Sequence, residues 1–266
     1  MTIRKPYAAG YFYPADREQI EAFMQAAMDQ SVEKKDAIAV MMPHAGYQYS
    51  GKTAARTIQR VRVTDTVILL GPNHTGYGAP FSLMAKGAWE SPLGTVSIDE
   101  TMAARILDAS EYVADDSEAH REEHSLEVQV PFLRYCNPAV KIVPVTIGSH
   151  DLDAVREVAG AIAGVLAEED ALIVISSDMT HYENAKTAER KDRRAIEAMI
   201  RLDEYALDAV VAEERLSMCG FIPAYCALIA AKTLGAERGD LVEYCTSGDT
   251  TGDYERVVGY AGLIIR

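Results

Sequence analysis

The chain has 266 residues, of which 48% are hydrophobic and 25% are charged, as is usual for a globular protein. Its formal net charge of −14 argues against nonspecific binding to nucleic acid or to an anionic membrane, because both need basic patches. A chain of this size buries enough apolar surface to fold without a structural metal, so any bound metal is expected to be functional.

Cysteine spacing and hydrophobic runs predict the compartment. The four cysteines are far apart and include no Cys-x-x-Cys pair, which predicts free thiols in a reducing setting. No signal-peptide pattern opens the sequence, and no uninterrupted apolar run reaches the ~18 residues that span a bilayer. We therefore expect a cytoplasmic protein that does not enter a membrane. Without linkers, repeats or low-complexity tracts, the sequence predicts one domain over residues 1–266.

Strands and helices are expected to alternate along the chain. An irregular, ordered aromatic arm at 1–16 comes first, and Asp16 and Ser50 are candidate N-caps of the first two helices. Four apolar runs rich in Val, Ile and Leu suit strands that are buried on both faces of a parallel sheet. The alternation predicts an α/β fold with a central, mostly parallel sheet flanked by helices. The expected elements are helices at 17–29, 51–60, 99–107, 151–166, 185–212 and 224–234, strands at 37–42, 66–70, 141–147, from 171, 241–246 and 256–265, a hairpin within 81–99 and a hairpin turn at 247–253.

Three of the apolar runs end in the same way, with polar side chains directly behind the strand. His44 follows the run in AIAVMMPHAGYQYS, His74 follows TVILLGPN, and Asp178 and His181 follow ALIVISS. In open α/β sheets, ligands bind outside the carboxyl ends of the strands, so these side chains are expected to share one site. Imidazole is a common ligand of Zn, Fe and Cu, which leads to the central hypothesis of one bound metal ion.

The other candidates each have a structural and a functional interpretation. Cys219 is either a core thiol or, at a helix entrance that would lower its pKa, a thiolate ligand. Asp178 is either a site residue or the N-cap of a following helix, and His181 is either a site residue or a surface histidine at the start of that helix, with neither interpretation favoured. His124 and Glu127 are more often a solvated helical pair, although an apolar stretch follows them closely. Three further residues are predicted to be structural: His120 and His150 at the surface and Cys226 in the core.

Two histidines and one anionic ligand leave open positions on a metal. Such a centre suits Fe(II) chemistry with dioxygen, or a metal-activated water. The remaining histidine and aspartate side chains would then act as general acids or bases, or would orient the ligands. Spacing and periodicity do not choose between these reactions.

Several short segments, in the same order and over nearly the whole chain, resemble the Memo family (mediator of ErbB2-driven cell motility), whose microbial members are called AmmeMemoRadiSam system protein B. The set is specific, although no single segment is. The segments are AGYFYP at 9–14, PHAGY at 43–47, GPNH at 71–74, EEHSLEVQVPF at 122–132, SSDMTH at 176–181, MCGFIP at 218–223 and VVGYAG at 257–262.

The resemblance implies a fold shared with the class III extradiol dioxygenases and a pocket that binds iron or copper, with zinc as a further candidate. Positions matching His44, His74 and Cys219 would bind the metal. Asp178, His181 and His124 would lie nearby as catalytic residues. A cysteine in place of the carboxylate ligand of the ring-cleaving enzymes favours softer or redox-active metals, Cu(I) among them, and so argues against ring cleavage.

Three functions remain open at this point. The first is a redox enzyme, an oxidase or dioxygenase of a small molecule that the sequence does not specify. The second is a metal-dependent hydrolase with Asp178 or His181 as the base. The third is a non-enzymatic binding module whose old metal pocket receives a peptide or a partner protein. Separately, the family's microbial name implies radical-SAM and AMMECR-type proteins as possible partners. The aromatic residues expected to be exposed near the site motivate the third: Tyr11, Tyr13, Tyr47 and Tyr49.

Overall fold

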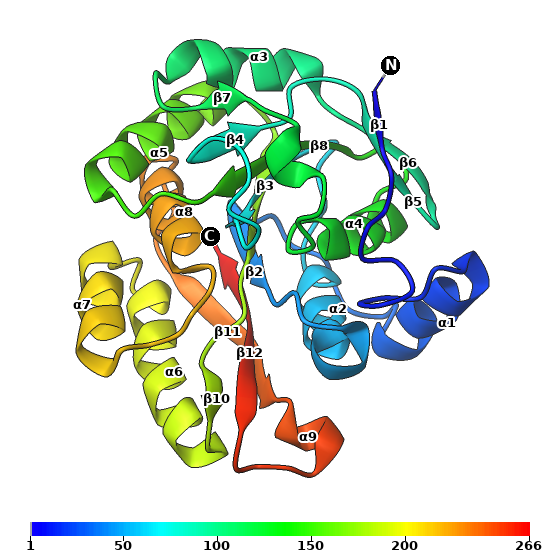
Figure 1. The fold of residues 1–266 in the computed structure, drawn as a ribbon, viewed down its shortest axis with the longest axis vertical. Coiled ribbons are helices and arrows are strands. Elements are labelled where there is room, and N and C mark those ends of the chain that lie inside the picture. Colours follow the sequence, from blue (N-terminus) through cyan, green and yellow to red (C-terminus); the bar gives the residue numbers. More distant parts are fainter. Residues whose placement is uncertain (1) are drawn as a thin grey trace.

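A computed structural model describes residues 2–266, and its centre is a mixed β-sheet (Figure 1). The strand order is β10-β12-β2-β9-β3-β8-β4-β7, and β11 pairs with β12 beside this path. A smaller sheet has the order β1-β5-β6. The strands are β1 (Ile3–Arg4), β2 (Ala39–Met42), β3 (Thr66–Pro72), β4 (Phe81–Leu83), β5 (Ala88–Ser91), β6 (Gly94–Ser97), β7 (Ala114–Asp115), β8 (Lys141–Ile147), β9 (Ala171–Ser176), β10 (His181–Glu183), β11 (Gly239–Thr246) and β12 (Val257–Ile265).

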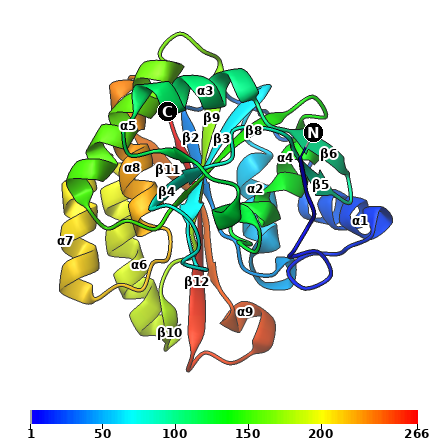
Figure 2. The same cartoon turned by 45° about the horizontal axis from the view of Figure 1, so that its top comes forward.

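Helices cover both faces of the large sheet. Figure 2 shows α5, α6, α7 and α8 together on one side and α1, α2 and α4 on the other. No helix among residues 2–266 is long and apolar enough to cross a lipid bilayer. The helices are α1 (Arg17–Ala27), α2 (Lys52–Ile58), α3 (Glu100–Ala109), α4 (Val130–Cys136), α5 (Leu152–Leu166), α6 (Ala185–Ile200), α7 (Glu204–Glu214), α8 (Phe221–Thr233) and α9 (Gly248–Thr251), with a π-helical turn at Tyr47–Gly51 and 3-10 turns at Glu118–His120 and Glu127–Gln129.

The predicted α/β fold with a mostly parallel centre is confirmed. Strands β2, β9, β3 and β8 are mutually parallel neighbours, and almost every residue in them is buried. This explains their continuous apolar sequences, since helices cover both of their faces. Antiparallel strands β12 and β4 flank this centre.

The register of the central strands places the candidate residues. Met42 at the end of β2 pairs with Ser176 at the end of β9, and Leu70 of β3 pairs with Ile175 of β9. The carboxyl ends of three adjacent strands therefore meet at one edge of the sheet. The segments that carry His44, His74 and Asp178 all leave the sheet from this edge.

The predicted starts of α1, α3, α5 and α6 are confirmed, because an aspartate or asparagine side chain satisfies a free backbone N–H group at each of them. Asp16 accepts a hydrogen bond from Gln19 N at the start of α1, and Asp99 and Asp151 cap α3 and α5 in the same way. The predicted Ser50 cap is wrong. The π-helical turn runs directly into α2, so no helix begins at Ser50, and its hydroxyl donates to Ala45 O at 3.1 Å.

Both predicted hairpins form. Strands β5 and β6 pair around 91–94, and they join β1 of the N-terminal arm in the small sheet. The arm is ordered, as expected, with Ala8 and Tyr13 buried. Strands β11 and β12 form the second hairpin, whose connection contains the single turn α9. The expected helical stretch at 185–212 is divided into α6 and α7, and Leu202 between them has a positive φ of 54°.

Candidate metal centre

Two histidines and a cysteine converge at the carboxyl edge of the sheet. The potential ligand atoms of His44, His74 and Cys219 all lie within 4.8 Å of one another. His44 Nε2 lies 3.2 Å from Cys219 Sγ. The rings of His44 and His74 meet edge to face, with centroids 5.3 Å apart. Segments separated by up to 175 residues thus bring together the three side chains that were predicted as ligands.

His44 is buried, and hydrogen-bonding partners fix both its ring and its backbone. Only 2% of its surface is exposed. Burial, with the nearby imidazoles of His124 and His74, holds the pKa of His44 well below its usual range, so the ring is neutral. Its Nδ1 lies 2.9 Å from Ser176 Oγ, and its backbone N–H donates to Asp178 Oδ1 at 2.8 Å. A neutral imidazole is the form that binds a metal.

Glu123, a residue that the sequence analysis did not select, holds His74. His74 Nδ1 donates to Glu123 Oε1 at 2.8 Å, and His74 N donates to Oε2 at 2.5 Å. Burial alone would raise the pKa of Glu123, but its bonds to His74 and Ser125 N outweigh burial and bring it to about 2. The carboxylate also raises the pKa of His74 against the lowering effect of burial. A carboxylate that accepts a hydrogen bond from one nitrogen of an imidazole makes the ring more basic, and the other nitrogen then binds a metal more strongly.

Cys219 lies in the turn before α8. Its Sγ accepts a hydrogen bond from Asp178 N at 3.2 Å. The turn packs tightly on the end of β9, because a Cβ at Gly220 would come within 2.6 Å of Ser176 O. The expectation of a lowered thiol pKa is wrong for the metal-free protein. Burial and the Asp178 charge raise the pKa of Cys219 well above its usual range and outweigh the hydrogen bonds that would lower it. Only a bound cation would deprotonate this thiol near neutral pH.

Asp178 and His181 flank the cluster. Asp178 Oδ1 accepts from the backbone N–H groups of His44 and Ala45, and Oδ2 lies 4.0 Å from His44 Nε2. Burial raises the pKa of Asp178 to about 6. His181 Nδ1 lies 2.9 Å from Ser217 O. The alternative interpretation of this pair as the start of a helix is wrong, because Asn184 caps α6 and His181 begins strand β10.

His124 also reaches the cluster, but not as a member of a helical pair. It precedes the 3-10 turn at Glu127–Gln129. The centroid of its ring lies 4.8 Å from that of His74, with the planes at 26°, and 4.4 Å from that of Phe12. Glu127 is 1% exposed and binds the N-terminal arm, so the expected solvated helical pair is wrong. His74, Glu123 and His124 form a second group of potential ligands within 4.8 Å. Because Glu123 Oε1 already accepts from His74 and Ser125, we assign this group to supporting the first.

Outside the cluster, the structure confirms some of the predicted burial and contradicts the rest. His150 is exposed and Cys226 is buried in α8, as predicted. His120 is not a surface residue; it is fully buried, 5.7 Å from the ring of Trp89. Tyr13 and Tyr47, expected to be exposed, are 3% and 5% exposed, whereas Tyr11 is 89% exposed.

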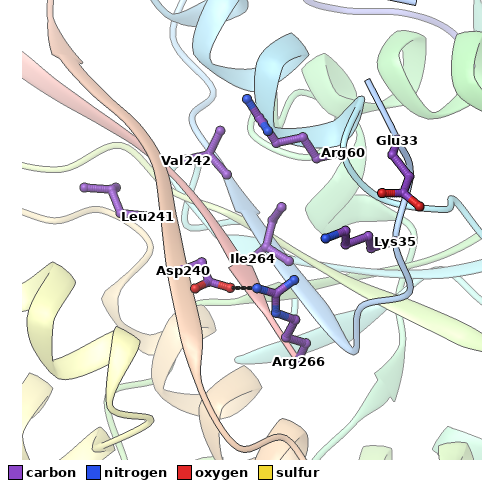
Figure 3. A pocket seen from close by; sticks show the side chains of 8 residues that line it. All are labelled: Glu33, Lys35, Arg60, Asp240, Leu241, Val242, Ile264 and Arg266. Carbon is purple, nitrogen blue, oxygen red and sulfur yellow. Dashed lines mark ion pairs between the residues drawn. The ribbon is translucent and has the colours of Figure 1, made fainter. Parts of the chain in front are cut away.

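A separate cavity lies at the opposite edge of the sheet (Figure 3). Its volume is about 340 Å³, and it contains none of the predicted site residues. Arg266, which follows β12, pairs there with Asp240 of β11 at 2.6 Å. The other lining residues are Glu33, Lys35, Arg60, Leu241, Val242 and Ile264. The residues predicted as metal ligands therefore do not line this cavity.

The fold and the cluster define an α/β protein with a candidate mononuclear metal centre at its strand ends. The chain belongs to the Memo family, because the family model described as Memo-like protein matches residues 4–264. It is 45% identical over 266 residues to a MEMO1 family protein of Aquifex aeolicus, with 99% of each chain covered. It is 40% identical to one of Methanopyrus kandleri, again with 99% of each covered, and 39% identical to one of Methanosarcina acetivorans, with 100% covered. These matches confirm the resemblance found in the sequence.

Proposed function

We propose that this protein binds one metal ion through His44, His74 and Cys219 and uses it for redox chemistry on a small substrate. The observation that carries the proposal is the mutual approach of the three ligand atoms within 4.8 Å, which suits one shared cation. Two imidazoles and a thiol fit iron or copper, and zinc as well, but not magnesium or calcium, which prefer oxygen ligands. Four-coordinate sites with three protein ligands keep one position open for substrate.

The residues around the cluster suit the transfer of protons. A bound iron or copper ion would supply the electron transfer, and zinc would supply a Lewis acid. Asp178, with a pKa of about 6, exchanges a proton readily near neutral pH. His181 and His124 place two more imidazoles beside the cluster. We assign these three residues to holding and moving protons on a substrate.

Two other functions have an observation in their favour. The raised pKa of Asp178 also suits the general base of a zinc hydrolase. Hydrolysis of an ester panel with zinc but not iron, lost in Asp178→Asn, would favour that function. Tyr11 lines a surface pocket of about 330 Å³ with Phe12, whose ring contacts His124, and this favours a partner-binding module. If the protein still captures a partner protein after the change Cys219→Ser, partner binding does not depend on the metal.

The proposal is tested by elemental analysis of protein purified without oxygen. We expect one transition-metal ion per chain in the wild type and a large loss in each of His44→Ala, His74→Ala and Cys219→Ser. Cys226→Ser is the matched control, because Cys226 is a fully buried thiol inside α8, and it should retain the metal. An unchanged metal content in all three site variants would show that these residues are not the ligands.

A further inference from the structure

Ser176 lies beneath His44 and contacts three buried polar groups. It ends strand β9 and pairs with Met42, two residues before His44. Its hydroxyl oxygen lies 2.6 Å from Ser125 O, 2.8 Å from Gln129 Nε2 and 2.9 Å from His44 Nδ1. Ser176, Ser125 and Gln129 are all fully buried, so water cannot substitute for these contacts.

The direction of each hydrogen bond follows from what the partners can do. A hydroxyl has one hydrogen and two lone pairs. Ser125 O is a carbonyl oxygen and can only accept, so it takes the single hydrogen of Ser176. The amide nitrogen of Gln129 can only donate, and its orientation is fixed because it also donates to Pro43 O at 3.0 Å. One lone pair of Ser176 remains, and it faces His44 Nδ1.

We infer that Ser176 is a positioning residue that, with Gln129 and Ser125, holds neutral His44 in the tautomer with its hydrogen on Nδ1. The lone pair of Nε2 is then presented to Cys219 Sγ, 3.2 Å away, where the cation would bind. The inference deepens the proposed function and rests on it only for the consequence for metal binding. The tautomer itself is a property of the metal-free protein.

The opposite tautomer would break the network. With its hydrogen on Nε2, His44 would need Nδ1 to accept from Ser176. The serine hydrogen would then leave Ser125 O, and that buried carbonyl would lose this partner. Two imidazoles near His44 are oriented in the same way, since His74 Nδ1 faces Glu123 Oε1 and His181 Nδ1 faces Ser217 O. In His44, His74 and His181 the Nδ1 atom contacts a supporting oxygen, and the Nε2 atom of His44 faces Cys219 Sγ.

The first test reads the tautomer directly in metal-free protein. Protein with ¹⁵N-labelled histidine is examined by long-range ¹H–¹⁵N NMR, and the His44 signals are assigned by their absence in His44→Gln. We expect Nδ1 to be protonated and Nε2 to be unprotonated. A protonated Nε2 in the wild type would overturn the inference. Since no metal is present, this result does not depend on the proposed function.

The second test removes the hydroxyl. Ser176→Ala should give a mixture of His44 tautomers and should weaken the affinity for zinc, used as the probe, by about 10–100-fold. Ser176→Thr keeps a hydroxyl and should restore both. A Ser176→Ala protein that loses stability but keeps the wild-type tautomer would reduce Ser176 to a structural role and overturn the inference. If the wild type shows the expected tautomer but binds no metal, the proposed function fails and the positioning role stands.

Discussion

The most demanding stability prediction concerns the buried ion pair between Arg4 of the N-terminal arm and Glu127 of the second 3-10 turn. Arg4 Nη1 lies 2.7 Å from Glu127 Oε2, and the two side chains are 5% and 2% exposed. Glu127 also accepts from Tyr7 N, Ala8 N and the Tyr13 hydroxyl. Among residues 2–266, Arg4 is the only cation that forms an ion pair with this carboxylate, and Arg4→Met removes it but leaves the carboxylate buried.

Breaking such a pair from one side costs about 3–5 kcal/mol, because the remaining charge is uncompensated. Arg4 also donates to the carbonyls of His120 at 2.6 Å and Glu123 at 2.8 Å, and these bonds are lost as well. With a urea m-value of about 2 kcal/mol/M, the unfolding midpoint of Arg4→Met should fall by roughly 2 M. Because Glu123 holds His74, metal affinity should fall together with stability.

The assay is urea unfolding followed by circular dichroism, with two controls. Lys5→Met removes the neighbouring pair with Glu90, whose side chains are 74% and 41% exposed, and should change stability by less than about 1 kcal/mol. Adding Glu127→Gln to Arg4→Met should restore part of the loss, because it removes the unpaired charge. A loss below about 1 kcal/mol in Arg4→Met would refute the reasoning.

Two more predictions concern a buried histidine and a pair of glycines. Burial and Arg4 lower the pKa of His120 from 6.5 to about 4, so between these values the unfolded state binds a proton that the folded state does not. The free energy of unfolding should therefore fall by about 3 kcal/mol as the pH drops from 6.5 to 4. Urea unfolding of His120→Phe at a series of pH values should show a free energy of unfolding that depends less on pH over this range. A Cβ at Gly262 would overlap Thr57 Oγ1, so Gly262→Ala should cost about 1–3 kcal/mol in thermal unfolding. Gly160→Ala in α5, where a Cβ meets nothing within 4 Å, should instead stabilise by about 0.5–1 kcal/mol, and equal effects of the two changes would contradict this account.

The strands and the ligand cluster could be predicted because their signals are local. A strand buried on both faces needs an uninterrupted apolar run, and β3 and β8 show this directly in sequence. Parallel strands then bring their carboxyl ends to one edge, so His44 and His74 could be placed together without coordinates. Cys219 lies before a helix rather than behind a strand, and only the resemblance and then the fold joined it to them.

The residues that support the ligands could not be predicted, because their roles depend on partners far along the chain. Glu123 reads as one charge among several in REEH, yet it is buried against His74. Ser176 reaches His44 through the register of β2 and β9, and Gln129 reaches Ser176 from the 3-10 turn at Glu127–Gln129. His120 was expected at the surface, but Trp89 and Arg4 enclose it. Sequence spacing carries no information on such pairings.

The central claim is that one ion is bound by two imidazoles and a sulfur. X-ray absorption spectroscopy at the edge of the metal in anaerobically purified protein tests it most directly. The account predicts one sulfur and at least two nitrogen neighbours in the wild type, with the sulfur lost in Cys219→Ser and kept in Cys226→Ser. A wild-type spectrum without sulfur, or a sulfur neighbour that persists in Cys219→Ser, would contradict it.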